Sequence, residues 1–135
     1  MEKAQQRNLV LILARELAAN SATAMFVVDP GGTLAFFNEP AERVLGRSFA
    51  ETGPLGPKEW GTIFSPVDGD GKTIPVEHLP LNKALRDLTP GHLAMTITGL
   101  DGEERNIAVT AFPLFARADE FVGALAIFWE EKRVG

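Results

Sequence analysis

The first hydrophobic pattern along the chain is helical. Residues 2 to about 19 contain no Gly or Pro and are rich in Ala, Leu, Glu, Lys, Gln and Arg, residues that favour the α-helix. At helical spacing, one stripe gathers Leu9, Val10, Leu13, Ala14 and Leu17. The pattern therefore predicts an amphipathic helix that docks through this stripe.

Two large apolar side chains of the same segment, Leu11 and Ile12, lie outside the stripe. One interpretation is a helix end tucked into its own domain. The other is a helix that packs on its own domain and also on a second subunit. We favour the second, because large apolar side chains that are exposed together mark an interface.

The next pattern is that of strands. Two short apolar runs, residues 24–29 and 33–37, flank the turn sequence Pro30-Gly31-Gly32 and predict a β-hairpin. Asn38 follows and is suited to cap a short helix, which Gly46 would end.

The remainder of the chain begins with an irregular stretch, residues 46–80, which holds 6 Gly and 5 Pro. Helical spacing after Pro80 predicts a helix with Leu81, Ala84, Leu85 and Leu88 on one face. Alternation then predicts three strands, at residues 92–98, 107–111 and 121–129. This order of elements indicates an α+β fold, not the alternating βαβ order of a parallel sheet.

Length and composition narrow the class of protein. The 135 residues fit one domain, and a hydrophobic fraction of 45% is that of a globular protein. A net charge of -5 without a basic stretch argues against a nucleic-acid surface. The early apolar run, residues 9–14, is too short for a signal-peptide core or a membrane helix. We expect a soluble, cytoplasmic protein without a membrane partner.

No residue pattern argues for an enzyme. The chain has no Cys and no Tyr, its serines lack a nucleophile-elbow context, and no spacing selects a catalytic carboxylate pair. The Gly71-Lys72-Thr73 sequence lacks the glycine that a phosphate-binding loop needs, and Asp68 does not start a calcium loop. We interpret the two histidines, His78 and His92, as surface residues. No metal site is predicted.

Residues 24–38, followed by Glu42-Arg43-Val44-Leu45-Gly46, resemble the opening of a PAS domain. The likeness continues through Trp60, Asp70-Gly71-Lys72-Thr73-Ile74-Pro75, Pro80-Leu81 with Ala84-Leu85, Asp101-Gly102, Phe112-Pro113-Leu114 and Val122-Gly123-Ala124-Leu125. It covers about residues 20–130. Each motif is weak alone, and their order carries the resemblance.

The resemblance implies a five-stranded antiparallel sheet in the order 2-1-5-4-3, with short helices on one face and a pocket between them. By this similarity we expect ten residues to line the pocket: Phe26, Val28, Leu85, Leu88, Met95, Ile97, Ile107, Val109, Leu125 and Ile127. All are apolar. The pocket would therefore be either a filled core or a site for a small apolar ligand.

The opposite face of the sheet would carry Met25, Val27, Ala108, Phe112, Val122, Ala124, Ala126 and Phe128. That face is too apolar for water, and we expect the N-terminal helix and a second subunit to cover it. The predicted dimer interface comprises Leu9, Leu11, Ile12, Leu13, Val122, Ala124, Ala126 and Phe128. Residues 1–20 would form the dimerisation helix and residues 21–131 the PAS domain.

The resemblance implies a non-enzymatic signalling module, a homodimer that senses a small apolar ligand or binds a partner such as a kinase or regulator. No cofactor is predicted. A haem or flavin sensor stays open as an alternative, since haem needs only one axial histidine. The lack of Cys rules out flavin–cysteinyl chemistry and a thioester-linked chromophore. A small α+β cone enzyme is a further alternative, disfavoured because the expected inward positions hold no carboxylate. The chain would be either free-standing or a module of a longer protein.

Overall fold

The computed structural model describes residues 2–131, with side chains from residue 9 onward. Its centre is a five-stranded antiparallel sheet in the order β2-β1-β5-β4-β3, which confirms the expected topology. The strands are β1 (Ala24–Val28), β2 (Leu34–Phe37), β3 (Gly91–Thr98), β4 (Glu104–Arg117) and β5 (Glu120–Glu130). In the part of the chain that is described, no helix is both long enough and apolar enough to cross a membrane.

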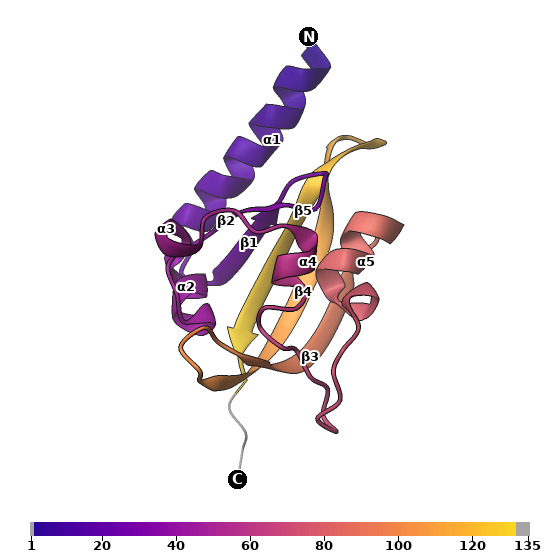
Figure 1. Ribbon diagram of the computed structural model, residues 1–135. Coiled ribbons are helices and arrows are strands. Elements are labelled where there is room, and N and C mark those ends of the chain that lie inside the picture. Colours follow the sequence, from indigo (N-terminus) through magenta and orange to yellow (C-terminus); the bar gives the residue numbers. More distant parts are fainter. Residues whose placement is uncertain (1, 132–135) are drawn as a thin grey trace.

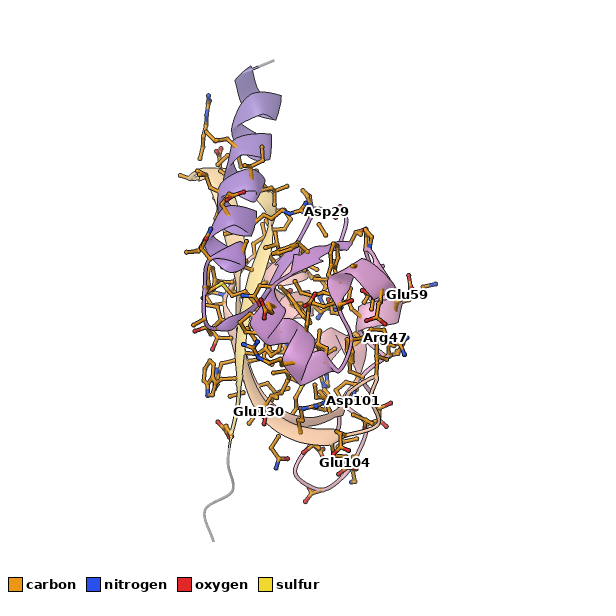
Figure 2. The ribbon with its side chains drawn as sticks, turned by 90° about the vertical axis from the view of Figure 1, so that its left-hand side faces the viewer. Asp29, Arg47, Glu59, Asp101, Glu104 and Glu130 are labelled. Carbon is orange, nitrogen blue, oxygen red and sulfur yellow. The ribbon has the colours of Figure 1, made fainter. Side chains whose placement is uncertain are left out.

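Helices cover both faces of this sheet. One face carries α2 (Glu39–Leu45), α3 (Phe49–Thr52), α4 (Pro57–Trp60), the 3-10 helix η1 (Val76–His78) and α5 (Pro80–Asp87). The other carries α1 (Glu2–Ala19), whose N-terminal part runs past the end of the sheet (Figure 1). Figure 2 shows α1 on one side of the sheet and the short helices on the other.

The local signals in the sequence form the expected caps. The Asn38 side chain accepts a hydrogen bond from the Ala41 N–H and caps α2, and Gly46 ends α2 in the left-handed conformation with φ of 79°. Pro80 occupies the first turn of α5, where its missing N–H costs nothing. Leu88 ends α5 in the left-handed conformation, with φ of 56°.

The docked face of α1 differs from the predicted stripe. Leu11, Ala14 and Ala18 pack against the sheet, where they meet Met25, Val27, Phe112 and Leu125, whereas four other large residues stay exposed. Those four are Leu9, Ile12, Leu13 and Leu17, at 54%, 56%, 59% and 57% exposure. The prediction that Leu9, Leu13 and Leu17 dock was therefore wrong, because the small residues Ala14 and Ala18 let the helix lie close to the sheet. Leu11, expected in the dimer interface, is part of this intramolecular contact.

The two faces of β5 are also the reverse of those predicted. Directly opposite residues of an antiparallel pair share a face, and the register places Ala126 opposite Phe26 and Ala124 opposite Val28. Ala124, Ala126 and Phe128 thus lie on the side of the short helices and are wholly buried there. They do not form an outer, dimerising face, and Val122 is likewise fully buried.

Residue size accounts for this arrangement. The core beneath the short helices contains the rings of Phe26, Phe37, Trp60 and Phe64. The β5 residues opposite Phe26 and Val28 are the small Ala126 and Ala124, whereas the large Phe128 lies opposite the small Ala24. On the other face α1 contributes the small residues Ala14 and Ala18 beside Leu11, and the larger Leu125 and Ile127 fill the space there.

Candidate functional site: an apolar cavity

A cavity of about 70 Å³ lies between the sheet and the short helices. Four strands contribute its floor, with Phe26 from β1 and Met95 from β3 among the contacting residues. The full lining is Phe26, Leu45, Trp60, Phe64, Pro66, Leu79, Pro80, Leu81, Met95, Ile97, Ile107, Val109, Ala126 and Phe128. Every one of these side chains is apolar apart from the indole N–H of Trp60.

The structure brings together half of the residues that were expected to line the pocket. Phe26, Met95, Ile97, Ile107 and Val109 all reach it. Successive side chains of a strand point to opposite faces of the sheet, and this alternation along β1, β3 and β4 was enough to predict which side chains face the cavity.

The other five expected residues do not line the cavity. Val28 is buried in the same core but lies away from the cavity, and Leu85 is half-buried against that core. Leu88 is 44% exposed because the chain turns out of α5 at this residue. Leu125 and Ile127 lie on the opposite face of the sheet, against α1.

Sequence reasoning missed the cover of the cavity. Trp60 and Phe64 come from the Gly- and Pro-rich stretch between β2 and α5, and both are buried. Large aromatic residues in a stretch of turn residues were the available signal, since such side chains must pack on something. Ile63, a large aliphatic residue of the same stretch, is instead 37% exposed.

The polar atom of the Trp60 side chain, Nε1, already has a hydrogen-bond partner. Its Nε1–H donates a buried hydrogen bond of 2.7 Å to the carbonyl oxygen of Gly32, in the turn between β1 and β2. This bond joins the cover of the cavity to the hairpin and leaves the ring facing the cavity. The lining therefore offers a guest aromatic and aliphatic surface without a free hydrogen-bonding side chain.

An ion pair secures the edge of the cavity near Leu45. The Arg105 guanidinium lies 2.7 Å from Asp101, and this hydrogen bond, helped by the Glu103 N–H, lowers the pKa of Asp101 from 3.8 to about 2. The neighbouring Leu100 N–H donates to the carbonyl oxygen of Leu45, which ties this turn to α2. Asp101 lies near the lower end of the sheet in Figure 2, as does Glu130. The pair has a structural role at the cavity's margin.

Neither histidine reaches the cavity. His92 is exposed on β3, where its Nδ1 lies 2.7 Å from the Thr110 hydroxyl and its ring is 6.2 Å from that of Trp129. His78 lies in η1 and is absent from the lining. The cavity thus lacks an axial ligand for haem and the polar side chains that would hydrogen-bond a flavin ring. Among the described side chains, no group of three His, Asp or Glu could hold a metal ion.

A second feature of functional interest is the exposed side of α1. The apolar stripe, which we define as Leu9, Ile12, Leu13 and Leu17, lies on the helix face opposite Leu11, Ala14 and Ala18. Arg15, between these faces, is placed 4.8 Å above the Phe36 ring and helps to fix the rotation of the helix. A helix that is apolar on two opposite sides has room for a second partner surface.

Comparison with solved structures places this architecture among PAS domains. The PAS domain of a protein from Colwellia psychrerythraea matches with a TM-score of 0.63 and 21% identity, over 90% of this chain and 97% of that one. A Rhodobacter sphaeroides LOV protein matches with a TM-score of 0.69 and 15% identity, over 100% and 71%. The LOV domain of a blue-light activated histidine kinase from Erythrobacter litoralis matches with a TM-score of 0.65 and 16% identity, over 84% and 100%. No protein-family model and no curated protein sequence matches the chain. These likenesses establish the PAS fold.

Proposed function

We propose that this chain, a domain with the PAS fold, is a non-enzymatic signalling module that works as a homodimer through α1. The supporting observation is the apolar stripe of Leu9, Ile12, Leu13 and Leu17, each more than half exposed although the helix is already docked through another face. Apolar side chains clustered in this way mark a protein–protein contact.

A second copy of the chain is the occupant that we propose for this stripe. A two-fold interface is self-complementary, so one apolar stripe can pack on its own copy without any other surface. The wholly buried Ala124, Ala126 and Phe128 take no part, and the contact that we propose is formed by helix against helix. Each helix would then lie between its own sheet and the partner's helix.

We base the signalling role on the relative positions of the apolar cavity and the exposed stripe of α1. The cavity lies on one face of the sheet and α1 on the other, joined through β1, where Phe26 lines the cavity and Met25 packs against α1. A change in the cavity could thus reach the dimer contact through a single strand. The solved relatives include a domain of a histidine kinase, and we propose a kinase or a regulator as the downstream partner.

No catalytic role is proposed for the cavity. Its lining contains no side chain that could act as a nucleophile, acid or base, so the alternative of a small enzyme finds no support at this site. The haem and flavin alternatives are not carried further either, because the lining lacks the ligands that these groups require.

The oligomeric state tests the proposal. The variant Leu13→Lys/Leu17→Lys adds charge to the stripe without touching the docked face, and the control Thr73→Lys adds charge at an exposed position between α4 and η1, outside α1. We expect light scattering over a dilution series to give twice the 14.6 kDa chain mass for the wild type and Thr73→Lys. The double variant should have the mass of one chain with an unchanged circular dichroism spectrum. A monomeric wild type, or a double variant that still dimerises, would refute the interface.

A further inference from the structure

We propose that the cavity binds a small, neutral, apolar molecule no larger than about one aromatic ring, and that it takes neither a flavin nor a long acyl chain. This inference deepens the proposed function, on which it rests, by naming the class of ligand that the module senses. It is carried by the size of the cavity, the chemistry of its lining and the structure of its cover.

Size sets the first limit. The cavity volume is about 70 Å³, whereas sites for larger organic ligands measure roughly 300–1,000 Å³. A dry apolar cavity of about 150 Å³ binds benzene or xenon. The present cavity is about half that size, so xenon is the guest that needs the smaller adjustment and a single ring needs the cavity to widen. Met95 can supply that adjustment, because its unbranched thioether side chain changes rotamer readily.

The lining sets the second limit, which is chemical. Four aromatic rings border the cavity, those of Phe26, Trp60, Phe64 and Phe128, and the Phe26 and Phe128 rings already meet edge to face at 4.8 Å. An aromatic guest could add further edge-to-face contacts and a contact with the Met95 sulfur. A charged or hydrogen-bonding guest would lose its water without gaining a partner, because the only polar atom of the lining side chains, Trp60 Nε1, is bound to Gly32.

The cover gives such a guest a way in. The segment between α2 and α5, part of which lies over the cavity, contains two α-helices of four residues and a 3-10 helix of three. Short helices of this kind have few hydrogen bonds to break, so local opening costs less than unfolding of the sheet. The Trp60 side chain and a pair of backbone hydrogen bonds between Leu34 and Leu55 join this cover to the hairpin.

Methionine-methyl NMR of the full chain tests the inference, because the protein contains its own control. Met95 lines the cavity, while Met25 lies on the opposite face of the sheet against α1, and the two are equally buried at 8% and 7% exposure. The probes are xenon, benzene, decanoate and flavin mononucleotide. We expect xenon and benzene to shift the Met95 methyl signal in a saturable way and to leave Met25 in place, and decanoate and the flavin to shift neither.

A variant locates the guest. Ala126→Val adds two methyl groups to the cavity floor, and we expect it to weaken benzene binding at least tenfold while the spectrum stays that of a folded protein. Should this variant fail to fold, the wild-type titration still decides the matter. The inference is overturned if Met95 does not respond to xenon or benzene, if Met25 responds equally, or if the flavin binds stoichiometrically.

The same samples separate this inference from the proposed function. A dimer whose Met95 signal ignores xenon and benzene would leave the dimeric module standing and remove its apolar ligand. A monomer whose Met95 signal responds would keep the ligand site and remove the dimer.

Discussion

Asn38 is expected to be the most sensitive polar residue of the domain. It is 1% exposed, and its side chain makes four hydrogen bonds. Its oxygen accepts from the N–H groups of Met25 and Ala41, at 3.0 and 3.1 Å. Its nitrogen donates to the carbonyl oxygens of Ala18 and Thr23, both at 2.8 Å. This one side chain therefore joins the end of α1, the start of β1 and the start of α2.

The substitution Asn38→Ala would leave all four backbone partners without their bond. Loss of the cap of α2 costs about 1 kcal/mol, and each of the other three bonds contributes about 1 kcal/mol net. We therefore expect the free energy of unfolding to fall by about 4 kcal/mol, a large part of the roughly 5–15 kcal/mol that is typical of a domain.

Urea unfolding followed by circular dichroism measures this loss. With a urea dependence of roughly 1–3 kcal/mol per molar, the midpoint should fall by more than one molar unit. Asn20→Ala is the matched control, because Asn20 is exposed and its side chain makes one hydrogen bond, to the Glu16 carbonyl. That variant should change stability by less than about 0.5 kcal/mol.

Asn38→Asp separates the two halves of the network. The aspartate can still accept from Met25 and Ala41, but it cannot donate to Ala18 or Thr23 when ionised and would place a charge against their carbonyl oxygens. We expect it to be destabilised by at least about 2 kcal/mol at neutral pH. A loss below about 1 kcal/mol for both Asn38 variants would refute the reasoning, because it would mean that the four bonds contribute little.

Two further predictions concern the margins of the cavity. Trp60→Phe keeps an aromatic ring, although a smaller one, and leaves the buried Gly32 carbonyl without its donor, so the free energy of unfolding in urea should fall by about 1–3 kcal/mol. Trp129→Phe, at a residue that is 43% exposed, should lower it by less than about 0.5 kcal/mol; equal losses would contradict the role of the hydrogen bond. Arg105 lowers the pKa of Asp101 from 3.8 to about 2. The stabilisation of the folded state by this ion pair is therefore complete when the pH is above the pKa of the unfolded chain, 3.8, and is lost as the pH falls towards 2. The melting temperature of Asp101→Asn should therefore lie below that of the wild type at neutral pH, with a gap that closes in acid; a gap that persists at low pH would contradict the assignment.

The sequence by itself determined the five strands, the helices α1, α2 and α5, and their order, but not the short helices α3, α4 and η1 within residues 46–80. The Pro-Gly-Gly turn, the Asn38 cap, Gly46 and Pro80 are local signals, and a local signal acts through backbone conformation within a few residues. For the same reason the boundaries of α5 and of four strands agree with the structure to within a few residues, whereas β4, predicted at residues 107–111, runs from Glu104 to Arg117. The ordered motifs of the PAS resemblance then supplied the strand order, which local patterns cannot give.

Only the tertiary structure decided which face of each element is covered. Helical spacing in α1 is satisfied by two apolar stripes, and the contact with the sheet selected the one with Ala14 and Ala18, leaving Leu13 and Leu17 exposed. In β5 every residue from Gly123 to Phe128 is apolar, so the sequence shows no alternation of apolar and polar residues that would distinguish the two faces of the strand. The volumes of side chains on the neighbouring strands and helices settled the question, because large and small residues must alternate across a closely packed core.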